Sequence, residues 1–176
     1  MPSLSDTAYP QLKSNASLKE LTEVFTPSEH EATLARERTR RPVQHLGFLL
    51  LLKTFQRLGY FVRYAEIPIS IVRHVATSAG YDDIPASMET YDTDVTRNRH
   101  TKLILEFLGV SAYGQSGRQV VIDTCLQASR TRDDLPDIIN MAIEELIRRR
   151  YELPAFSTLL RIARTARSLS NRGYQI

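Results

Sequence analysis

Arginine is the residue type in this sequence whose number and spacing could do chemistry. The chain holds 19 arginines and four lysines, and residues 146–176 hold seven of the arginines against one acidic residue, Glu152, a net charge of +6. The planar guanidinium group binds phosphates and guanine edges through two parallel hydrogen bonds, which lysine cannot do. A high-GC genome that encodes arginine in place of lysine explains the composition equally well, so the positions of the arginines must decide.

The last predicted helix, over residues 157–172, places its arginines in a stripe. Arg161, Arg164 and Ser168 follow at i, i+3 and i+7, opposite an apolar face. Ser157 and Thr158 lie at the start of this helix, where hydroxyl groups and free backbone amides favour a phosphate.

This arginine helix follows another amphipathic helix at a short distance. A supporting helix over residues 135–150 and a turn over Tyr151–Phe156 complete the pattern of a helix-turn-helix. In that motif the second helix enters the major groove of DNA. The alternative interpretation is that the last helix is an amphipathic helix whose polar face is only solvated, or that it binds a partner protein.

A second module is predicted upstream. Ala76 and Gly80 have the four-residue spacing of a tight helix-turn-helix turn. The helix that follows carries four candidate DNA contacts on its outer flank: Thr96, Arg97, Arg99 and His100. A basic segment before the most apolar helix, Arg36 to Arg41, adds Arg40 and Arg41, and His45 is a further candidate just inside that helix. An exposed charged loop explains that basic segment equally well.

The spacing of apolar residues is helical almost throughout, and only seven glycines interrupt it. The predicted helices run from the capping box Thr26–Glu29 to about Arg38, from Pro42 to Leu58, from Pro68 to before Gly80, from Pro85 or Tyr91 to Gly109, from Ser116, from Asp133-Asp134 to before Pro154, and from Ser157 or Thr158. Seven successive apolar residues, Leu46 to Leu52, predict the most buried helix.

The expected fold class is therefore all-α, with two tandem modules of the helix-turn-helix type. We expect a flexible N-terminal arm over residues 1–16, a first DNA-binding module over 17–110 and a second over 111–176. The second module ends in the arginine helix.

Catalytic and membrane functions lack a basis in the sequence. The four histidines are scattered, the acidic doublets stand at predicted helix starts, and the single cysteine, Cys125, lies on an apolar face. The longest apolar run, seven residues, is too short to cross a bilayer, and no secretory signal begins the chain. We expect a non-catalytic intracellular protein with no metal or cofactor of its own.

Four segments together resemble the N-terminal region of the Tn-three-family (class II replicative) transposases: LGFLLLLKTFQRLGYF, IPISIVRHVA, TRNRHTKLILEFLG and LPAFSTLLRIARTAR. The resemblance covers roughly residues 20 to 170. It implies a helical region that binds the terminal inverted repeats of a transposon. It also implies that this chain is an N-terminal fragment, because the family's Asp/Asp/Glu site, which takes a divalent metal such as Mg, lies in an RNase H-like domain further along.

Individual motifs of the family can be located in this chain. The matches are Leu46-Gly47-Phe48 to LG(F/I), Thr96, Arg97 and His100 to TRxxH, and Leu153-Pro154 with Ser157-Thr158-Leu159 to LPGxxTL. The departures are Val43-Gln44-His45 in place of HNR, Asp94 in place of an arginine, and Ala155 in place of a glycine. These departures indicate a divergent branch with its own end sequence.

The residues and the resemblance together predict sequence-specific binding of double-stranded DNA at transposon ends. Arg161 and Arg164 are expected to reach base edges from one module, and Arg97, Arg99 and His100 from the other. The expected phosphate contacts are Arg40, Arg41, Arg148, Arg149 and Arg150, and Arg167 completes the candidate set. Two alternatives are a protein-interaction scaffold that docks an acidic partner or another transposase subunit, and a stand-alone repressor with a palindromic target and a stable dimer.

Overall fold

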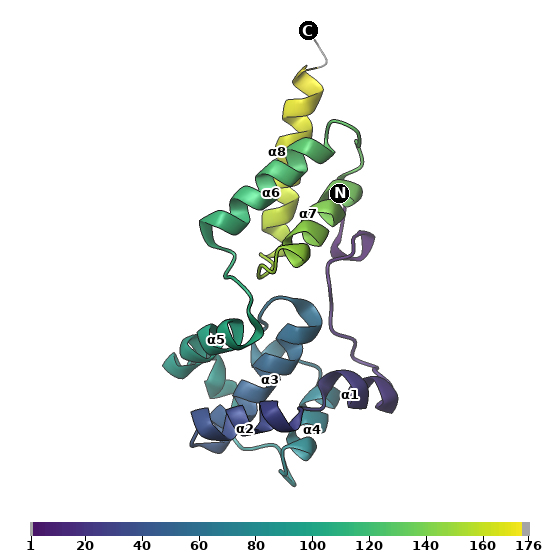
Figure 1. The fold of residues 1–176 in the computed structure, drawn as a ribbon. Coiled ribbons are helices and arrows are strands. Elements are labelled where there is room, and N and C mark those ends of the chain that lie inside the picture. Colours follow the sequence, from purple (N-terminus) through teal and green to yellow (C-terminus); the bar gives the residue numbers. More distant parts are fainter. Residues whose placement is uncertain (1, 174–176) are drawn as a thin grey trace. The chain divides into compact units, whose positions relative to one another are not determined.

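The structure is a computed structural model that describes residues 2–173, and its regular elements in that range are helices (Figure 1). The all-α class predicted from the sequence is confirmed. The only strand-like feature in the described range is a single bridge between Ser111 and Tyr151. The chain divides into two compact units, the central unit (residues 11–108) and the terminal unit (residues 2–10 with 109–173).

The central unit is built around one apolar helix (Figure 1). Its helices are α1 (Leu18–Phe25), α2 (Glu29–Arg38), α3 (Pro42–Leu58), α4 (Ile69–Ser78) and α5 (Val95–Leu108). Each of the other four helices packs against α3, and α1 also contacts α4. All seven residues from Leu46 to Leu52 are buried, which confirms the predicted core helix. Gly59 ends α3 in the left-handed conformation, with φ 82°.

The turn predicted at Gly80 is present, with φ 90° and the Tyr81 amide donating to the Ala76 carbonyl at 3.0 Å, but the next α-helix does not follow it directly. Residues 79–94 separate α4 from α5 and include the 3-10 helix η3 (Met88–Thr93). Within η3, Tyr91 is buried and its ring lies against Gly47 of α3, where a Cβ atom would be 2.6 Å from Tyr91 Cε2. The long helix predicted from Pro85 or Tyr91 therefore begins only at Val95. The physical reason is that a large ring gains more by filling the core than by continuing an exposed helix.

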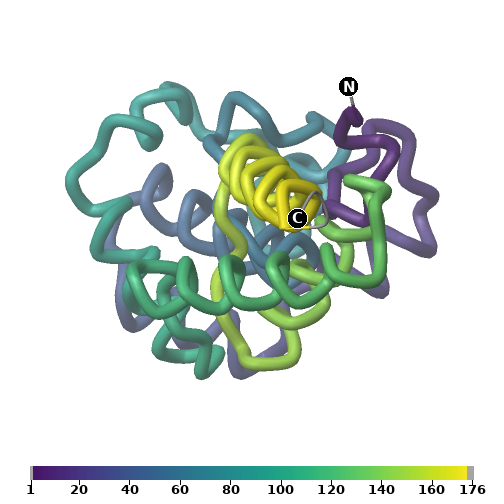
Figure 2. The backbone as a smooth tube through the Cα atoms, turned by 90° about the horizontal axis from the view of Figure 1, so that it is seen from above, coloured from purple at the N-terminus to yellow at the C-terminus, as the bar shows by residue number. Residues whose placement is uncertain are grey.

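The terminal unit consists mainly of three helices that pack on one another: α6 (Gly114–Ala128), α7 (Leu135–Arg148) and α8 (Phe156–Gly173). Figure 2 shows the yellow α8 nearly along its axis, with the green α6 and α7 beside it. α7 buries the apolar face that its sequence predicts: Leu135, Ile138, Ile139, Ala142, Ile143 and Leu146. Its first residue follows Asp134, as expected from the acidic doublet.

The beginning of the chain adds to the terminal unit. After the 3-10 helix η1 (Leu4–Asp6), the Ala8 amide donates to Asn140 Oδ1 at 2.7 Å, and the Tyr9 hydroxyl donates to the Pro154 carbonyl at 2.8 Å. The Tyr9 ring packs edge-on against Phe156. These contacts differ from the arm predicted over residues 1–16, because a tyrosine both buries its ring and satisfies its hydroxyl here.

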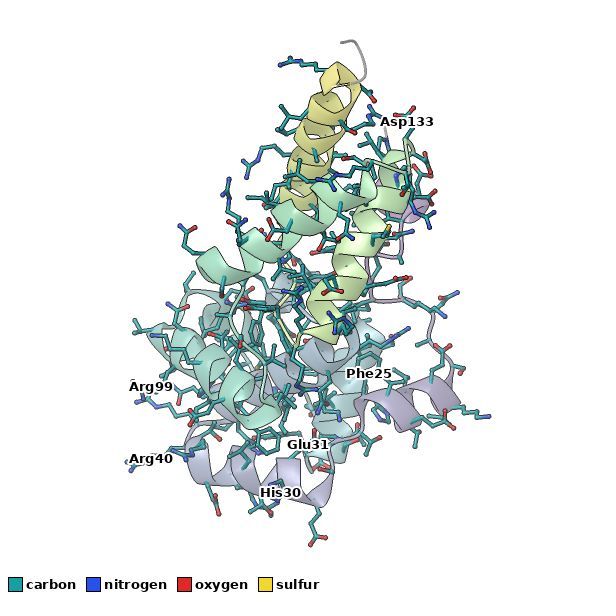
Figure 3. All side chains as sticks on the ribbon, turned by 45° about the horizontal axis from the view of Figure 1, so that its top comes forward. Phe25, His30, Glu31, Arg40, Arg99 and Asp133 are labelled. Atoms are coloured by element: carbon teal, nitrogen blue, oxygen red, sulfur yellow. The ribbon has the colours of Figure 1, made fainter. Side chains whose placement is uncertain are left out.

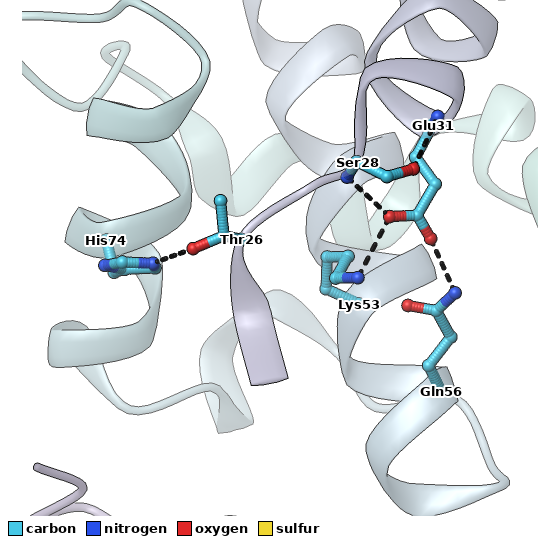
Figure 4. Close-up of polar contacts among 6 residues, drawn as sticks. All are labelled: Thr26, Ser28, Glu31, Lys53, Gln56 and His74. Carbon is cyan, nitrogen blue, oxygen red and sulfur yellow. Dashed lines mark hydrogen bonds and ion pairs between the residues drawn. The ribbon is translucent and has the colours of Figure 1, made fainter. Parts of the chain in front are cut away.

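A buried ion pair joins α2 to α3 in the central unit (Figure 4). Lys53 Nζ lies 3.0 Å from Glu31 Oε1, and Gln56 Nε2 donates to Glu31 Oε2 at 2.6 Å. Burial alone would raise the pKa of Glu31, but hydrogen bonds from the Ser28 amide, Lys53 and Gln56 outweigh it, so the pKa is lowered. Ser28 and Glu31 form the capping box of α2. The predicted box began at Thr26, which instead ends α1.

Candidate nucleic-acid interface

The arginines of α8 point in different directions. Arg161 and Arg172 are exposed and lie on the same side of the helix, eleven residues or about three turns apart. Arg164 is half-buried. Arg167 is also half-buried, and its Nη1 donates to the Asp133 carbonyl at 3.3 Å. The exposed stripe that the sequence predicted is therefore centred on Arg161 and Ser168, whereas Arg167 faces the start of α7.

The first turn of α8 begins one residue earlier than predicted. The amides of Thr158 and Leu159 both donate to the Ala155 carbonyl, so Ala155 occupies the cap position. Ser157 and Thr158 consequently lie inside the first turn, the former exposed and the latter half-buried. The Ser157 hydroxyl remains on the outer surface of this positively charged helix start.

The connection between α7 and α8 is longer than a tight turn. It spans residues 149–155. Arg150 has φ 60°, and the Tyr151 amide that follows it closes α7 by donating to the Leu146 carbonyl. Ser111 then pairs with this connection, donating to Arg150 and accepting from Glu152. The segment before α6 therefore fixes the approach to α8.

Arg148, Arg149 and Arg150 are exposed at the end of α7. Glu145 pairs with two of them, at 2.5 Å from Arg148 Nη2 and 2.6 Å from Arg149 Nε. The hydrogen bonds from Arg148 and then Arg149 lower the pKa of Glu145 to about 2. Arg150 Nε donates to the Gly109 carbonyl at 3.1 Å. One carboxylate cannot neutralise two guanidinium groups, so the cluster of Glu145, Arg148 and Arg149 keeps a net positive charge.

Two of the predicted contacts at the start of α5 form internal links. Arg97 is half-buried, and its Nη2 donates to the Val62 carbonyl at 3.0 Å, which ties α5 to the loop after α3. The Thr96 amide donates to Asp94 Oδ1 at 2.9 Å. Asp94, where the family pattern has an arginine, thus caps α5, and the Thr96 hydrogen bonds lower its pKa.

Both histidines among the predicted contacts turn inward. His100 is buried, its Nδ1 is hydrogen-bonded to the Tyr91 hydroxyl at 2.6 Å, and its ring meets Phe48 edge-on. His45 is half-buried and its Nδ1 is hydrogen-bonded to the Tyr81 hydroxyl at 2.7 Å. Burial is the main cause of the lowered pKa of each, so both side chains are neutral at pH 7. In the structure, His45 and His100 thus link elements within the central unit.

The remaining candidates of the central unit are exposed arginines. Arg40 and Arg41 lie between α2 and α3, and Arg99 lies on the outer side of α5. Figure 3 shows the Arg40 and Arg99 side chains pointing outward on the same side of this unit. A phosphate backbone could reach these groups without any change in the core.

Arg118 is a surface arginine that sequence reasoning missed. It lies on α6 and lines, together with Arg161, a groove of about 350 Å³ between α6 and α8. No pattern in the sequence singles it out, because Arg118 stands alone in a segment with little charge. Only the packing of α6 on α8 brings the two arginines to one groove.

Residues 2–173 contain no group of three or more His, Cys, Asp or Glu side chains that could hold a metal ion. Cys125 is buried, which raises the pKa of its thiol to about 12 and keeps it protonated. None of the helices in this range has the length and apolar character that crossing a bilayer requires.

Comparison with known proteins identifies the family. A model of the family described as Domain of unknown function (DUF4158) matches residues 4–166. The chain belongs to the DUF4158 family. This DUF4158 chain is also 27% identical, over 155 residues or 87% of its length, to the transposase for transposon Tn501 of Pseudomonas aeruginosa. The predicted relation to transposases is confirmed, and the chain spans about 15% of the length of that relative.

Proposed function

We propose that this DUF4158 chain binds double-stranded DNA sequence-specifically at the terminal inverted repeats of a transposon, as the N-terminal part of a transposase in replicative transposition. The observation that carries the proposal is the similarity to the Tn501 transposase, which extends over most of the chain. The surface supports binding of a polyanion, because the four charged side chains of α8 are all arginines. The polar groups that face inward form internal hydrogen bonds, which hold the helices that carry this surface in place.

In the terminal unit, α8 is the proposed reading helix. Arg161 and Arg164 contact base edges in the major groove, where arginine recognises guanine through two hydrogen bonds. Ser157 and Thr158 hold a phosphate at the start of the helix. Arg148, Arg149 and Arg150 at the end of α7 contact further phosphates, and Arg167 supports α8 from its inner side.

In the central unit, Arg40, Arg41 and Arg99 are the proposed DNA contacts. Thr96 and Arg97 act as positioning residues, because their hydrogen bonds to Asp94 and Val62 fix the start of the helix that carries Arg99. Two separate groups of arginines suit a long, asymmetric site. We assign no catalytic step and no metal to these residues; a divalent metal such as Mg belongs to the catalytic part of a transposase, and the cytoplasm of a bacterium, at the nucleoid, is the proposed location.

The test is a titration of the chain with two duplexes at two salt concentrations. One duplex carries the terminal inverted repeat of the parent transposon, and the other has the same bases in scrambled order. We expect a preference of tenfold or more, about 1.4 kcal/mol, that persists at the higher salt concentration. Equal binding that collapses with salt would leave only a generic basic surface.

Two substitutions separate reading from general attraction. Arg161→Ala should lose about 1–3 kcal/mol of preference for the end sequence. Arg149→Ala should weaken binding to both duplexes equally and lower the salt slope by about one. If both variants merely lose affinity in parallel, the roles of Arg161 and Arg149 are assigned wrongly.

A protein-interaction scaffold is the second candidate function, favoured by exposed apolar residues. Leu126 and Leu169 line the α6–α8 groove and are 37% and 52% exposed. Such a groove suits an amphipathic segment of another transposase subunit. Competition decides between the candidates: duplex carrying the end sequence should displace a bound DNA probe but leave a bound protein segment in place.

A further inference from the structure

Arg118 and Arg161 face one groove from two different helices. Both side chains are exposed, and the rest of the lining is apolar or uncharged, including Ile122 and Ile162. No ion pair joins either arginine to an acidic residue within residues 2–173. Two cations that share a groove without a carboxylate repel each other, and a bound anion relieves that repulsion.

Tyr113 stands directly before α6, the helix that carries Arg118. Burial raises the pKa of Tyr113, and the charges of Arg118 and Arg161 oppose that rise. The Tyr113 hydroxyl is buried and has no hydrogen-bond partner among the described residues. Its ring lies over α6 at Gly117, where a Cβ atom would be only 2.8 Å from Tyr113 Cδ2. Any larger residue at position 117 would move this ring.

The Tyr113 backbone is fixed as well. Its amide donates to Glu152 Oε1 at 3.2 Å, in the connection that leads to α8. This hydrogen bond ties the start of α6 to the connection that leads to α8. Arg118 is carried by α6 and Arg161 by α8, so their spacing is set by the packing of these two helices.

We propose that Arg118 binds a backbone phosphate of the duplex whose bases Arg161 contacts. This inference rests on the proposed function and adds a residue to it. Phosphate fits the observations because a guanidinium group binds two of its oxygens at once, and because α8 is the helix proposed to lie on DNA. Arg118 then fixes the position of α8 along the groove, while Arg161 supplies sequence preference.

The experiment compares Arg118→Ala, Arg118→Lys and Arg161→Lys with the unsubstituted chain. Each is titrated with the terminal-repeat duplex and the scrambled duplex over a series of salt concentrations. We expect Arg118→Ala to weaken binding to both duplexes by the same factor and to lower the salt slope by about one. Arg118→Lys should restore the slope, because a point charge still binds phosphate. Arg161→Lys should lose the preference for the terminal repeat, because lysine lacks the planar fork that recognises guanine.

Arg132→Ala is the matched control. Arg132 lies in the same unit and is about half exposed, but it pairs with Asp137 at 3.8 Å and does not line the groove. The Arg132→Ala substitution removes one positive charge and should leave the salt slope unchanged. An equal fall in slope for Arg132→Ala and Arg118→Ala would reduce the effect to net charge and overturn the proposed contact.

The outcomes separate this inference from the proposed function. If the unsubstituted chain prefers the terminal repeat but Arg118→Ala leaves affinity and slope unchanged, the phosphate contact is wrong and the proposed function stands. If the chain binds both duplexes equally and Arg118→Ala still lowers the slope, the contact stands and end recognition is wrong. If Arg118→Ala leaves DNA binding intact and abolishes capture of an acidic peptide, the groove binds protein and the inference is overturned.

Discussion

The two units use their polar side chains in opposite ways. The central unit contains all four histidines, and three of them are hydrogen-bonded to a hydroxyl group: His45 to Tyr81, His74 to Thr26 and His100 to Tyr91. It also buries the Glu31–Lys53 ion pair. The terminal unit has no histidine in its sequence, and its buried helix faces are almost entirely apolar. Its arginines lie mainly at the surface.

This difference separates stability from binding. A buried charge or imidazole must be paired, because leaving it without a partner costs more than the hydrogen bond itself contributes. An exposed guanidinium group carries no such requirement and contributes little to stability. Substitution of a buried polar residue in the central unit should therefore lower the free energy of unfolding. Substitution of an exposed arginine in the terminal unit should instead alter DNA binding.

The largest effect is expected from Lys53→Met. Removal of the ammonium group leaves Glu31 buried without its cation, which costs about 3 kcal/mol or more of unfolding free energy. Denaturant unfolding followed by circular dichroism measures the loss, and hydrogen exchange locates it in the central unit. Arg132→Met, which breaks an exposed pair, is the control and should cost about 0–1 kcal/mol. Equal losses for the two variants would remove the contrast between the units.

Gly47→Ala should destabilise the central unit by about 1–3 kcal/mol. The new methyl group would lie 2.6–2.7 Å from the Tyr91 ring, which is itself buried and hydrogen-bonded to His100. Thermal unfolding measures the change. Gly173→Ala is the control, because a Cβ atom there has no neighbour within 4 Å among the described residues. A stability of Gly47→Ala equal to that of the unsubstituted chain would show that Tyr91 moves freely.

Acid should weaken the central unit before the terminal unit. Burial lowers the pKa of His45, His74 and His100 from the ordinary 6.5, so the folded state takes up these protons at a lower pH than the unfolded chain. As the pH falls through 6.5 the unfolded chain takes up protons first, and stability decreases below that pH. Hydrogen exchange at pH 7.5 and pH 5.5, corrected for intrinsic rates, should show the loss in the central unit. Replacing His45 and His74 by glutamine should reduce it.

The smallest stability effect is expected from Arg161→Ala. The side chain is exposed and alanine favours helix, so the unfolding free energy should change by less than about 0.5 kcal/mol. Preference for the terminal repeat should nevertheless fall, as described above. Thermal unfolding and DNA titration of the same preparation test both statements. A large loss of stability would assign Arg161 to the structure of the unit and not to binding.

The helices that sequence predicted well are those whose pattern leaves one choice. The seven apolar residues of α3 offer no polar face, so burial on all sides follows directly. The broad apolar face of α7 and the glycine that ends α3 are equally local signals. Their energies come from residues within a few turns of one another, which a single sequence displays.

The helix boundaries that sequence placed wrongly depend on distant partners. Thr26 and Ser28 are both good capping residues, but Thr26 is hydrogen-bonded to His74 of α4 and Ser28 begins α2 (Figure 4). The residues around Tyr91 favour a helix that includes it, yet the Tyr91 ring packs against Gly47 and α5 starts only after it. In each case a contact made far along the chain outweighs a local preference of similar size.

The candidate site divides in the same way. Sequence by itself determined the helical class, the apolar faces and the concentration of arginine near the end of the chain, because these depend on composition and on periods of a few residues. Only the tertiary structure decided that His45 and His100 turn inward and that Arg97 and Arg167 make internal hydrogen bonds. It also decided that Arg118 and Arg161 line one groove. The direction of a polar side chain depends on which partner the packed helices bring within about 3 Å, and that distance is set by the fold.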